Sequence, residues 1–389
     1  MRVLHVIPAV APRYGGPSTA IGPLCQALNR LPGVRVELAT TDADGPTRLT
    51  PADLPAGVPA HVFGGVRTES LKYSPALHRW LRQHARDYDL LHLHSLWTAP
   101  PALAAAAARR AGVPYIVRPA GMLSDYTFAR GRLKKQLFWL LVERRTVAGA
   151  AAFHATSEQE AAEVRAVRPG AAVAVIDNGV GEDAWTTPAD PGHLAGLCGP
   201  AAAGRPVVLF LSRLHPKKGL ADLLLPAFAM LRTPAVLAIA GGADDSAPGY
   251  PSEVRQAVRR LGLADRVVLL GAVPPAERWR VLDGAAVFVL PSHQENFGIA
   301  LAEAMARGRP VVVTDRVQAA PHVTAAGAGA VVSPDPAALA AALDGLLADL
   351  AGRAAAGARA AAYARERFGW DRVAGEVAAL YRRCLGSGP

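Results

Sequence analysis

Two stretches of this chain alternate short apolar runs with segments of helical character. The runs fall at residues 2–7, 34–40, 90–94, 114–118, 152–156 and 172–176, and again at 207–211, 235–240, 267–270, 286–290 and 311–313. Such alternation predicts mostly parallel sheets covered by helices. Residues 186–206 lose the pattern and collect prolines and glycines. We therefore predict an α/β fold with an N-terminal unit, a linker, a C-terminal unit and a last amphipathic helix, over residues 1–185, 186–206, 207–368 and 369–389.

Composition limits the kinds of partner and the cellular compartment that we predict for the chain. Hydrophobic residues make up 51% of the 389, as in globular chains, and the net charge of +10 permits an anionic partner such as a nucleotide or a phospholipid. The basic residues are dispersed and form no known nucleic-acid motif, so no nucleic-acid partner is expected. Three scattered cysteines without a C-x-x-C pair indicate a reducing compartment and no cysteine metal site. No apolar run approaches the ~20 residues that span a bilayer.

Residues 291–315 read as loop, helix, stop and strand. Asn296 is a good N-cap residue, and a helix is predicted over 297–307. Gly308 is suited to the position after a helix, and Pro310 prevents the helix from continuing. The first amides of such a helix lack intrahelical acceptors, so the backbone near Phe297 and Gly298 is a candidate phosphate site.

Two carboxylates mark this segment, Glu295 before the helix and Glu303 within it. Glycosidases hold their two carboxyl groups ~5 to ~9.5 Å apart. Eight helical positions would separate these two by ~12 Å of rise. The arrangement therefore favours two carboxylates that bind two parts of one long ligand over a hydrolytic pair.

A basic loop follows the strand at 207–211. Arg213 can bind phosphate through two N–H groups, and Lys218 supplies a compact charge. The loop lacks Walker A spacing and would, alone, be a solvated turn. Together with the helix start near Phe297, it favours diphosphate binding.

Two features of the N-terminal half leave alternatives open. Gly15 and Gly16 would let a turn approach a ligand at a helix start, although an ordinary strand-to-helix turn also explains them. His92 and His94 share one strand face, with His94 at the strand end, where ligands bind in open α/β sheets. A ligand contact and a packed histidine are equally compatible with His94. A zinc site would need a third convergent ligand.

Residues 130–145 combine clustered bases with a dense apolar stretch. A helix on a membrane surface is one interpretation. The apolar positions at 137–142 cover nearly every face, however, which favours a core helix with basic ends.

Taken together, these motifs resemble family GT4, the glycosyl transferases group 1. Residues 295–310 resemble its E-x7-E signature, residues 212–219 its phosphate loop, and residues 178–180 and 15–16 two further recurrent segments. The resemblance covers nearly the whole chain in the right order. It implies a GT-B fold, in which two Rossmann-like domains face each other across a cleft. The N-terminal domain would bind the acceptor, the C-terminal domain the nucleotide sugar, and the last helix would cross back to the N-terminal domain.

The resemblance also implies an activity, a retaining sugar transfer from a nucleotide-diphosphate sugar without a metal or a cofactor. It assigns Arg213 and Lys218 to the diphosphate as it leaves, and Glu295 to the donor sugar. Residues implied to bind the donor are Gly16, Val273, Asn296, Phe297, Gly298 and Glu303, with Glu303 at the ribose and Val273 near the base.

The same resemblance implies a glycan, a lipid-linked molecule or a small molecule as acceptor, in the synthesis of a polysaccharide, glycolipid or other glycoconjugate. It places the chain in the cytoplasm, with a peripheral contact at the inner face of the plasma membrane left open. Two alternatives remain: a nucleotide-sugar epimerase of the same fold, and a weakly catalytic subunit that binds a nucleotide sugar for a partner.

One turn departs from the family pattern. Many relatives have Pro-His-Gly after the strand at 115–118, and that histidine contacts the donor sugar. Here the turn is Pro119-Ala120-Gly121. We expect that Arg118 or His94 compensates, or that the donor lacks the usual polar group.

Overall fold

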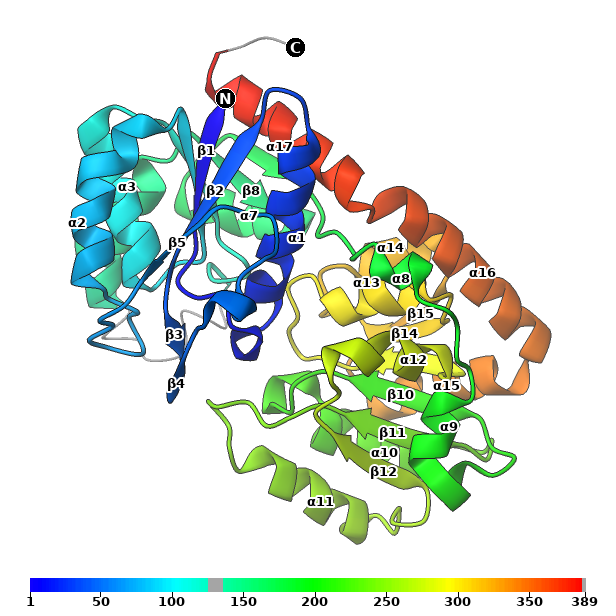
Figure 1. Ribbon diagram of the computed structural model, residues 1–389. Coiled ribbons are helices and arrows are strands. Elements are labelled where there is room, and N and C mark those ends of the chain that lie inside the picture. Colours follow the sequence, from blue (N-terminus) through cyan, green and yellow to red (C-terminus); the bar gives the residue numbers. More distant parts are fainter. Residues whose placement is uncertain (125–135, 387–389) are drawn as a thin grey trace. The chain divides into compact units, whose positions relative to one another are not determined.

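A computed structural model describes residues 1–124 and 136–386 of the chain. The chain divides into two compact units (Figure 1). Unit 1 comprises Met1–Gly179 and Trp370–Pro389, and unit 2 comprises Val180–Gly369. Each unit is built on its own parallel sheet, so the predicted α/β fold of two Rossmann-like domains is confirmed.

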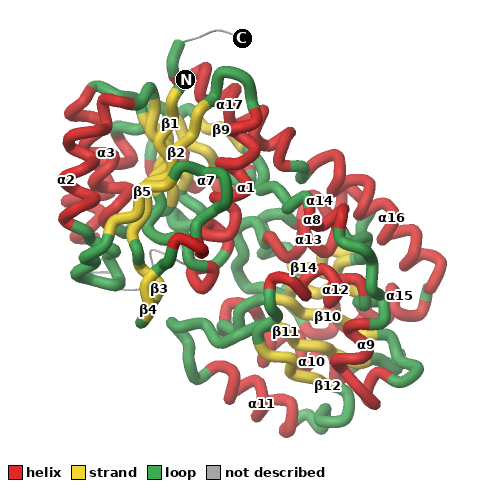
Figure 2. Tube along the Cα trace, in the orientation of Figure 1, coloured by secondary structure: helices red, strands yellow, loops and turns green. Residues whose placement is uncertain are grey.

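The sheet of unit 1 has seven parallel strands in the order β5-β2-β1-β6-β7-β8-β9. These strands are β1 Arg2–Val6, β2 Arg35–Thr41, β5 Ala60–Phe63, β6 Leu90–His94, β7 Tyr115–Arg118, β8 Ala152–Ala155 and β9 Val173–Val175. The helices of the unit are α1 Gly16–Arg30, α2 Pro75–His84, α3 Ala99–Ala111, α6 Arg144–Ala148, α7 Glu158–Val167 and α17 Trp370–Cys384. Every residue of β6, β7 and β8 is buried, as expected for parallel strands with helices on both faces (Figure 2).

The sheet of unit 2 has six parallel strands in the order β12-β11-β10-β13-β14-β15. These are β10 Val207–Leu211, β11 Val236–Ala240, β12 Val267–Gly271, β13 Val287–Leu290, β14 Val311–Thr314 and β15 Gly329–Val332. Its helices are α8 Asp183–Thr186, α9 His193–Cys198, α10 Leu225–Ala229, α11 Tyr250–Arg260, α12 Arg278–Asp283, α13 Ile299–Ala306, α14 Ala320–Ala326, α15 Pro336–Ala348 and α16 Leu350–Arg367.

The strand order of each sheet reverses at one point. In unit 1 the chain extends from β1 to β2 on one side and to β6 on the other. In unit 2 it extends from β10 to β11 and to β13. Ligands of open α/β sheets bind beyond the carboxyl ends of the strands at such points. The loops after β10 and β13, and those after β1 and β6, are therefore the places to look for a site.

The segment predicted as a linker is structured. Residues 186–206 include α9, where Leu194 and Cys198 are buried in the core of unit 2. The division between the units falls at Gly179 and Val180 instead. Prolines and glycines suggested a linker because they interrupt the helical pattern, yet the short helix between them still buries apolar side chains.

The last helix, α17, belongs to unit 1, as expected (Figure 1). It packs against α1, and its buried residues include Val373, Val377 and Tyr381. Helix α17 therefore completes the core of the N-terminal unit although it is the last element of the chain.

The predicted start of helix α13 was wrong. Helix α13 begins at Ile299, and Gly298 rather than Asn296 is its N-cap residue, because Gly298 takes a positive φ of 76° that ends the loop there. Between β2 and β5, the chain also forms a small antiparallel pair, β3 (Ala43–Asp44) and β4 (Thr47–Arg48).

The apolar stretch at 137–142 also differs from the prediction. Leu137, Leu140 and Leu141 are exposed, so the stretch is not a core helix. The stretch contains a π-helical turn, Trp139–Glu143, in which the spacing of the side chains is wider than in an α-helix. The basic residues at 130–135, which the sequence analysis assigned to one end of this helix, lie outside the described residues. Among the helices that the structure describes, none is long and apolar enough to cross a membrane.

Candidate functional site

Opposite charges meet beyond the strand ends at the reversal point of unit 2. Lys218, from the loop after β10, donates a hydrogen bond from Nζ to Oε2 of Glu295, from the loop after β13. Both side chains are largely buried. Arg213, also after β10, lies close enough for its charge to act on Glu295. The structure thus brings together all three residues that were predicted to be catalytic.

The two loops are held in place by close backbone packing. Gly219 ends the basic loop with a φ of 68°, and a Cβ atom at this position would clash with the carbonyl oxygen of Pro291. His293 donates its amide to the Lys217 oxygen at 2.8 Å. The Glu295 backbone is fixed between Arg316 and Gln318, with N···O distances of 3.2 and 3.0 Å. The position of the Glu295 carboxylate is therefore set by the fold.

The charge state of Glu295 follows from its neighbours. Burial alone would raise the pKa of its carboxyl, but the positive charges of Lys218 and Lys217, and the hydrogen bond from Lys218, bring it below the ordinary value. Burial conversely lowers the pKa of Lys217. Glu295 is therefore an ionised carboxylate at neutral pH, surrounded by cations.

Arg213 is held by a residue that the sequence analysis missed. Its Nη1 donates to Oδ2 of Asp244 at 2.6 Å. Asp244 follows β11, the strand next to β10, and also accepts from the amide and hydroxyl of Ser246. These contacts outweigh burial and lower the pKa of Asp244. The half-exposed guanidinium keeps N–H groups available for an anion.

The start of α13 presents backbone donors. The amides of Phe297, Gly298, Ile299 and Ala300 have no hydrogen-bond partner among the described residues. The Phe297 side chain is buried against Phe368 and His322, with ring centroids 5.7 and 6.2 Å away. Only the backbone of Phe297 is therefore suited to a ligand.

Glu303 lies on the buried face of α13 and has a different partner, Arg278, at 3.0 Å. Burial raises the pKa of Glu303 to about 7, and the charge of Arg278 only partly opposes this. Glu303 and Glu295 therefore have separate partners and separate protonation behaviour, as expected for carboxylates that bind two parts of one ligand. Val273, in the loop after β12, is half-buried against the unit 2 core.

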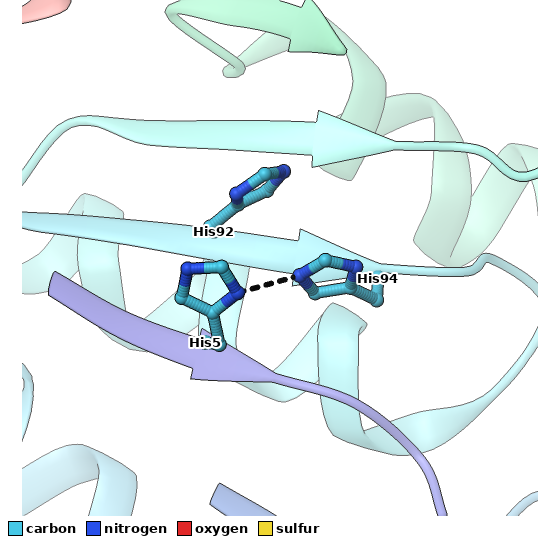
Figure 3. Close-up of side chains that lie close together, drawn as sticks. All are labelled: His5, His92 and His94. Atoms are coloured by element: carbon cyan, nitrogen blue, oxygen red, sulfur yellow. Dashed lines mark hydrogen bonds between the residues drawn. The ribbon is translucent and has the colours of Figure 1, made fainter. Parts of the chain in front are cut away.

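In unit 1, the strand ends carry a chain of buried hydrogen bonds, and Figure 3 shows its histidines, His5 from β1 and His92 and His94 from β6. His5 Nδ1 lies 2.9 Å from His94 Nε2, as drawn in Figure 3. His5 Nε2 and His92 Nδ1 each lie 2.8 Å from the hydroxyl of Tyr381 on α17. Burial and the Arg118 charge lower the pKa of His5 to about 3, and burial also lowers those of His92 and His94. All three rings are therefore neutral.

When the Tyr381 hydroxyl donates to one of its two histidines, neutral rings leave this chain two arrangements of protons. If His94 donates to His5, then His5 donates to Tyr381 and Tyr381 to His92; otherwise every bond is reversed. Of the two choices for His94, the packed histidine is the one that the structure favours, since its ring is fully buried and bonded to His5.

His5 is also the third convergent side chain that a metal site would need. The potential ligand atoms of His5, His92 and His94 lie within 4.8 Å of one another. Each ring is hydrogen-bonded to another ring or to Tyr381, although His92 Nε2 and His94 Nδ1 have no partner among the described residues. The positive charge of Arg118, paired with His94 across β6 and β7, opposes a cation. The donor atoms suit zinc, but their surroundings do not.

Arg118 is buried, 3% exposed, and one of its Nη atoms donates to Oδ1 of Asn178. Its Nε has no partner among the described residues. The following turn places Ala120 at a φ of 55°, an uncommon conformation for a residue with a side chain. The turn thus has a demanding backbone shape at the position where the family resemblance led us to expect a histidine.

Glu143 is a second residue that the sequence analysis missed. It is fully buried, and its Oε1 accepts the amide of Trp97 at 2.6 Å. Burial raises the pKa of Glu143 to about 7. Ser95 and Trp97, in the loop after β6, have φ values of 73° and 62°. Glu143 therefore fixes a strained loop beside His94.

The sequence analysis missed four site residues for the same reason. Asp244, Arg278, Glu143 and Tyr381 act through partners distant in the sequence. Only Asp244 carried a usable signal, because it follows the glycine turn at the end of a predicted strand next to the basic loop.

Comparisons with known proteins place both units in one family. The family model described as "Glycosyl transferases group 1" matches residues 205–349, and that described as "Glycosyl transferase 4-like domain" matches residues 15–179. D-inositol 3-phosphate glycosyltransferase 2 of Catenulispora acidiphila is 32% identical over 94% of this chain and 84% of its own length. D-inositol 3-phosphate glycosyltransferase of Streptomyces avermitilis is 31% identical over 99% and 87%.

Solved structures agree on the fold. Anabaena Alr3699/HepE, solved with UDP and glucose, has a TM-score of 0.79 at 23% identity and covers 98% of this chain and 100% of its own. Sucrose-phosphate synthase from Thermosynechococcus elongatus has a TM-score of 0.78 at 22% identity, with both chains covered fully. Since family models match both units and relatives above 30% identity span the chain, it belongs to family GT4, the glycosyl transferases group 1, and is a glycosyltransferase of the GT-B fold.

Proposed function

We propose that the chain transfers a sugar, with retention of anomeric configuration and without a metal, from a nucleotide-diphosphate sugar to an acceptor. The observation that carries this proposal is the buried Lys218–Glu295 pair beside Arg213, at the carboxyl ends of β10 and β13. The Anabaena structures hold UDP, UDP-glucose and glucose, which supports a nucleotide sugar as donor.

The two cations stabilise the diphosphate as it leaves. Arg213 and Lys218 are each paired with a carboxylate, Asp244 and Glu295, which holds them at the strand ends before the donor arrives. A diphosphate binds to these cations and to the first amides of α13. As the bond to the sugar breaks, negative charge grows on the diphosphate, and fixed donors stabilise this charge more than they stabilise the ground state.

Glu295 orients the donor sugar. Its carboxylate is ionised and hydrogen-bonded to Lys218, so it accepts hydrogen bonds from sugar hydroxyls rather than attacking the anomeric carbon. Glu303 accepts from the ribose, and Val273 contacts the base. Gly16, at the start of α1 after the Gly15 turn, is a further residue that we propose for donor binding.

Unit 1 binds the acceptor. The curated relatives act on D-inositol 3-phosphate, as their names state, and we propose an acceptor from polysaccharide, glycolipid or other glycoconjugate synthesis in the cytoplasm. Because Arg118 and His94 are buried, we propose that they support the turn at Ala120 from behind instead of replacing the missing histidine by direct contact.

A donor screen tests the proposal. UDP-, GDP-, ADP- and dTDP-sugars are added to the purified chain and thermal unfolding is followed. A ligand at 100 times its Kd stabilises by ~2.7 kcal/mol, so one nucleotide should stand out. Lys218→Ala should lose this response, whereas Arg260→Ala, which removes an exposed cation at the end of α11, is the charge control.

Transfer itself is then followed by NMR with the selected donor. Retention predicts that donor and product share the anomeric configuration, and EDTA should leave the rate unchanged. No response to any nucleotide sugar contradicts the proposal. Interconversion of the free sugar nucleotide without an acceptor would identify an epimerase, and donor binding without hydrolysis or transfer would identify a binding subunit.

A further inference from the structure

Three exposed leucines lie on one helical face of unit 1. Leu137, Leu140 and Leu141 are 59%, 59% and 61% exposed. Among the described residues, they are the only large apolar side chains of such exposure that lie within four positions of one another. Residues three and four apart share a helix face, so the three leucines form one continuous apolar patch.

The opposite face of this segment is firmly packed. Phe138 and Trp139 lie against Trp97, with ring centroids 6.4 and 6.0 Å away. Glu143 and Val147 are buried. The segment is therefore amphipathic and anchored, and the fold itself directs the leucines outward.

Arginines border the leucines. Arg144 and Arg145 follow directly and are exposed. Arg109, at the end of α3, donates to the Arg145 oxygen at 3.1 Å, which brings the exposed pair Arg109 and Arg110 to the same region. The only acidic residue in α3 and in residues 136–148 is Glu143, and it is buried. The surface thus combines exposed leucines with positive charge and no exposed carboxylate of its own segments.

We propose that Leu137, Leu140, Leu141, Arg144 and Arg145, here called the leucine–arginine face, dock onto the surface of an anionic lipid bilayer. The leucines enter the boundary between headgroups and acyl chains, and the arginines contact lipid phosphates. Charge complementarity selects this occupant, because a purely apolar partner would leave the exposed Arg144 and Arg145 without an anion. The contact is peripheral, since no described helix is long and apolar enough to span a membrane.

Vesicle flotation tests the docking and needs no sugar donor, so its result is independent of the proposed function. The intact chain is mixed with phosphatidylcholine vesicles with or without about one third phosphatidylglycerol. We expect binding to the anionic vesicles that weakens with added salt. Changing Arg144 and Arg145 to Ala should weaken it roughly 25-fold, the product of about fivefold for each arginine near an anionic leaflet.

A second set of variants tests the contribution of the leucines. Changing Leu137, Leu140 and Leu141 to Ser should weaken vesicle binding at least about tenfold, because little apolar surface then enters the bilayer. Leu350→Ser is the matched control, since Leu350 is 68% exposed but lies in unit 2. Arg259→Ala with Arg260→Ala, an exposed pair at the end of α11, is the charge control. Thermal unfolding of each variant shows whether it is folded.

Three outcomes overturn the proposal. The first is that the unchanged chain ignores anionic vesicles. The second is that folded triple-serine and double-alanine variants bind as the unchanged chain does. The third is a dimer in analytical ultracentrifugation that the triple-serine variant dissociates, which would assign the face to a second copy of the chain.

Discussion

The Lys218–Glu295 pair is buried in the same apolar unit that supports it, so each charge depends on the other. Removing one partner of a buried pair leaves an uncompensated charge and costs about 3–5 kcal/mol, whereas removing both can be nearly neutral. Glu295→Gln should therefore lower the free energy of unfolding by about 3 kcal/mol. Adding Lys218→Met should restore most of it, as measured by urea denaturation. If the double variant is less stable than Glu295→Gln alone, the pair does not stabilise Lys218 in this way.

Under the proposed function, Glu303 should give nucleotide binding a pH dependence. The pKa of its carboxyl is about 7, and a ribose hydroxyl donates better to the ionised form. As pH falls from about 8 to about 6, the ionised fraction drops about tenfold, and donor affinity should fall by about the same factor. Calorimetry across this range measures the change. Glu303→Gln cannot ionise and should show a flat profile; a slope retained in this variant would assign the pH dependence to another group.

Glu143 affects stability instead. Its folded pKa of about 7 exceeds the ordinary 4.5, so the native state holds the proton more tightly than the unfolded chain. Stability should therefore fall as pH rises from 4.5 through about 7, by at most about 3 kcal/mol. In Glu143→Gln, the side-chain oxygen can still accept the Trp97 amide. The glutamine does not ionise, so the loss of stability with rising pH should be absent. Denaturation at about pH 5 and about pH 8 compares the free energies of unfolding. That of the variant should rise relative to that of the unchanged chain only at the higher pH.

How far the sequence predicts a site residue depends on how local its partners are. Glu295, Glu303 and Lys218 stand in contiguous motifs and were singled out from them, whereas the direct contact between Lys218 and Glu295 was not predicted. Arg278 and Glu143 acquire their roles only when distant segments meet, so spacing along the chain carries no sign of them.

At the scale of elements, strands and long helices were predictable because their apolar periods are strong, whereas their ends depend on backbone angles. Helix α13 starts two residues later than predicted because Gly298 adopts a φ of 76°. The exposed leucines were mistaken for part of a core helix because apolar side chains at nearly every position of 137–142 suggested burial on all sides, and such a pattern does not reveal which face lacks a neighbour.

Replacing Gly219 tests whether close backbone packing fixes the loop between β10 and α10. Its φ is 68°, and a Cβ atom would clash with the Pro291 oxygen. Gly262 in the same unit has nearly the same φ, 66°, with nothing near its Cβ position. Both changes to Ala carry the backbone strain, of order 1 kcal/mol, but only Gly219→Ala adds the clash. Gly219→Ala should therefore lower thermal stability and donor affinity clearly more than Gly262→Ala. Equal effects would mean that the clash is relieved by a small loop shift.

At the scale of the whole molecule, each unit has its own sheet, and unit 2 has its own core, of which Phe210 and Phe288 are part. Residues 180–369, expressed alone, should therefore fold cooperatively and bind the donor nucleotide, though more weakly without Gly16. Removing residues 370–389 from the full chain should destabilise unit 1, because α17 carries buried Tyr381. Hydrogen exchange should then rise in β1 and β6 but not in β10 and β13. Faster exchange in β10 would contradict this division.

The chain passes between the two units at two points, and these two points lie next to each other. The chain enters unit 2 at Val180 and leaves it after Gly369, and these two residues form a bridge. Gly179 and Trp370, on the unit 1 side, are so close that no side chain fits at Gly179. Unit 2 is thus a single insertion into unit 1, and its two ends lie side by side. We expect that residues 180–369 can be exchanged for those of a relative as one segment. Under the proposed function, such an exchange would change the sugar donor and keep the acceptor.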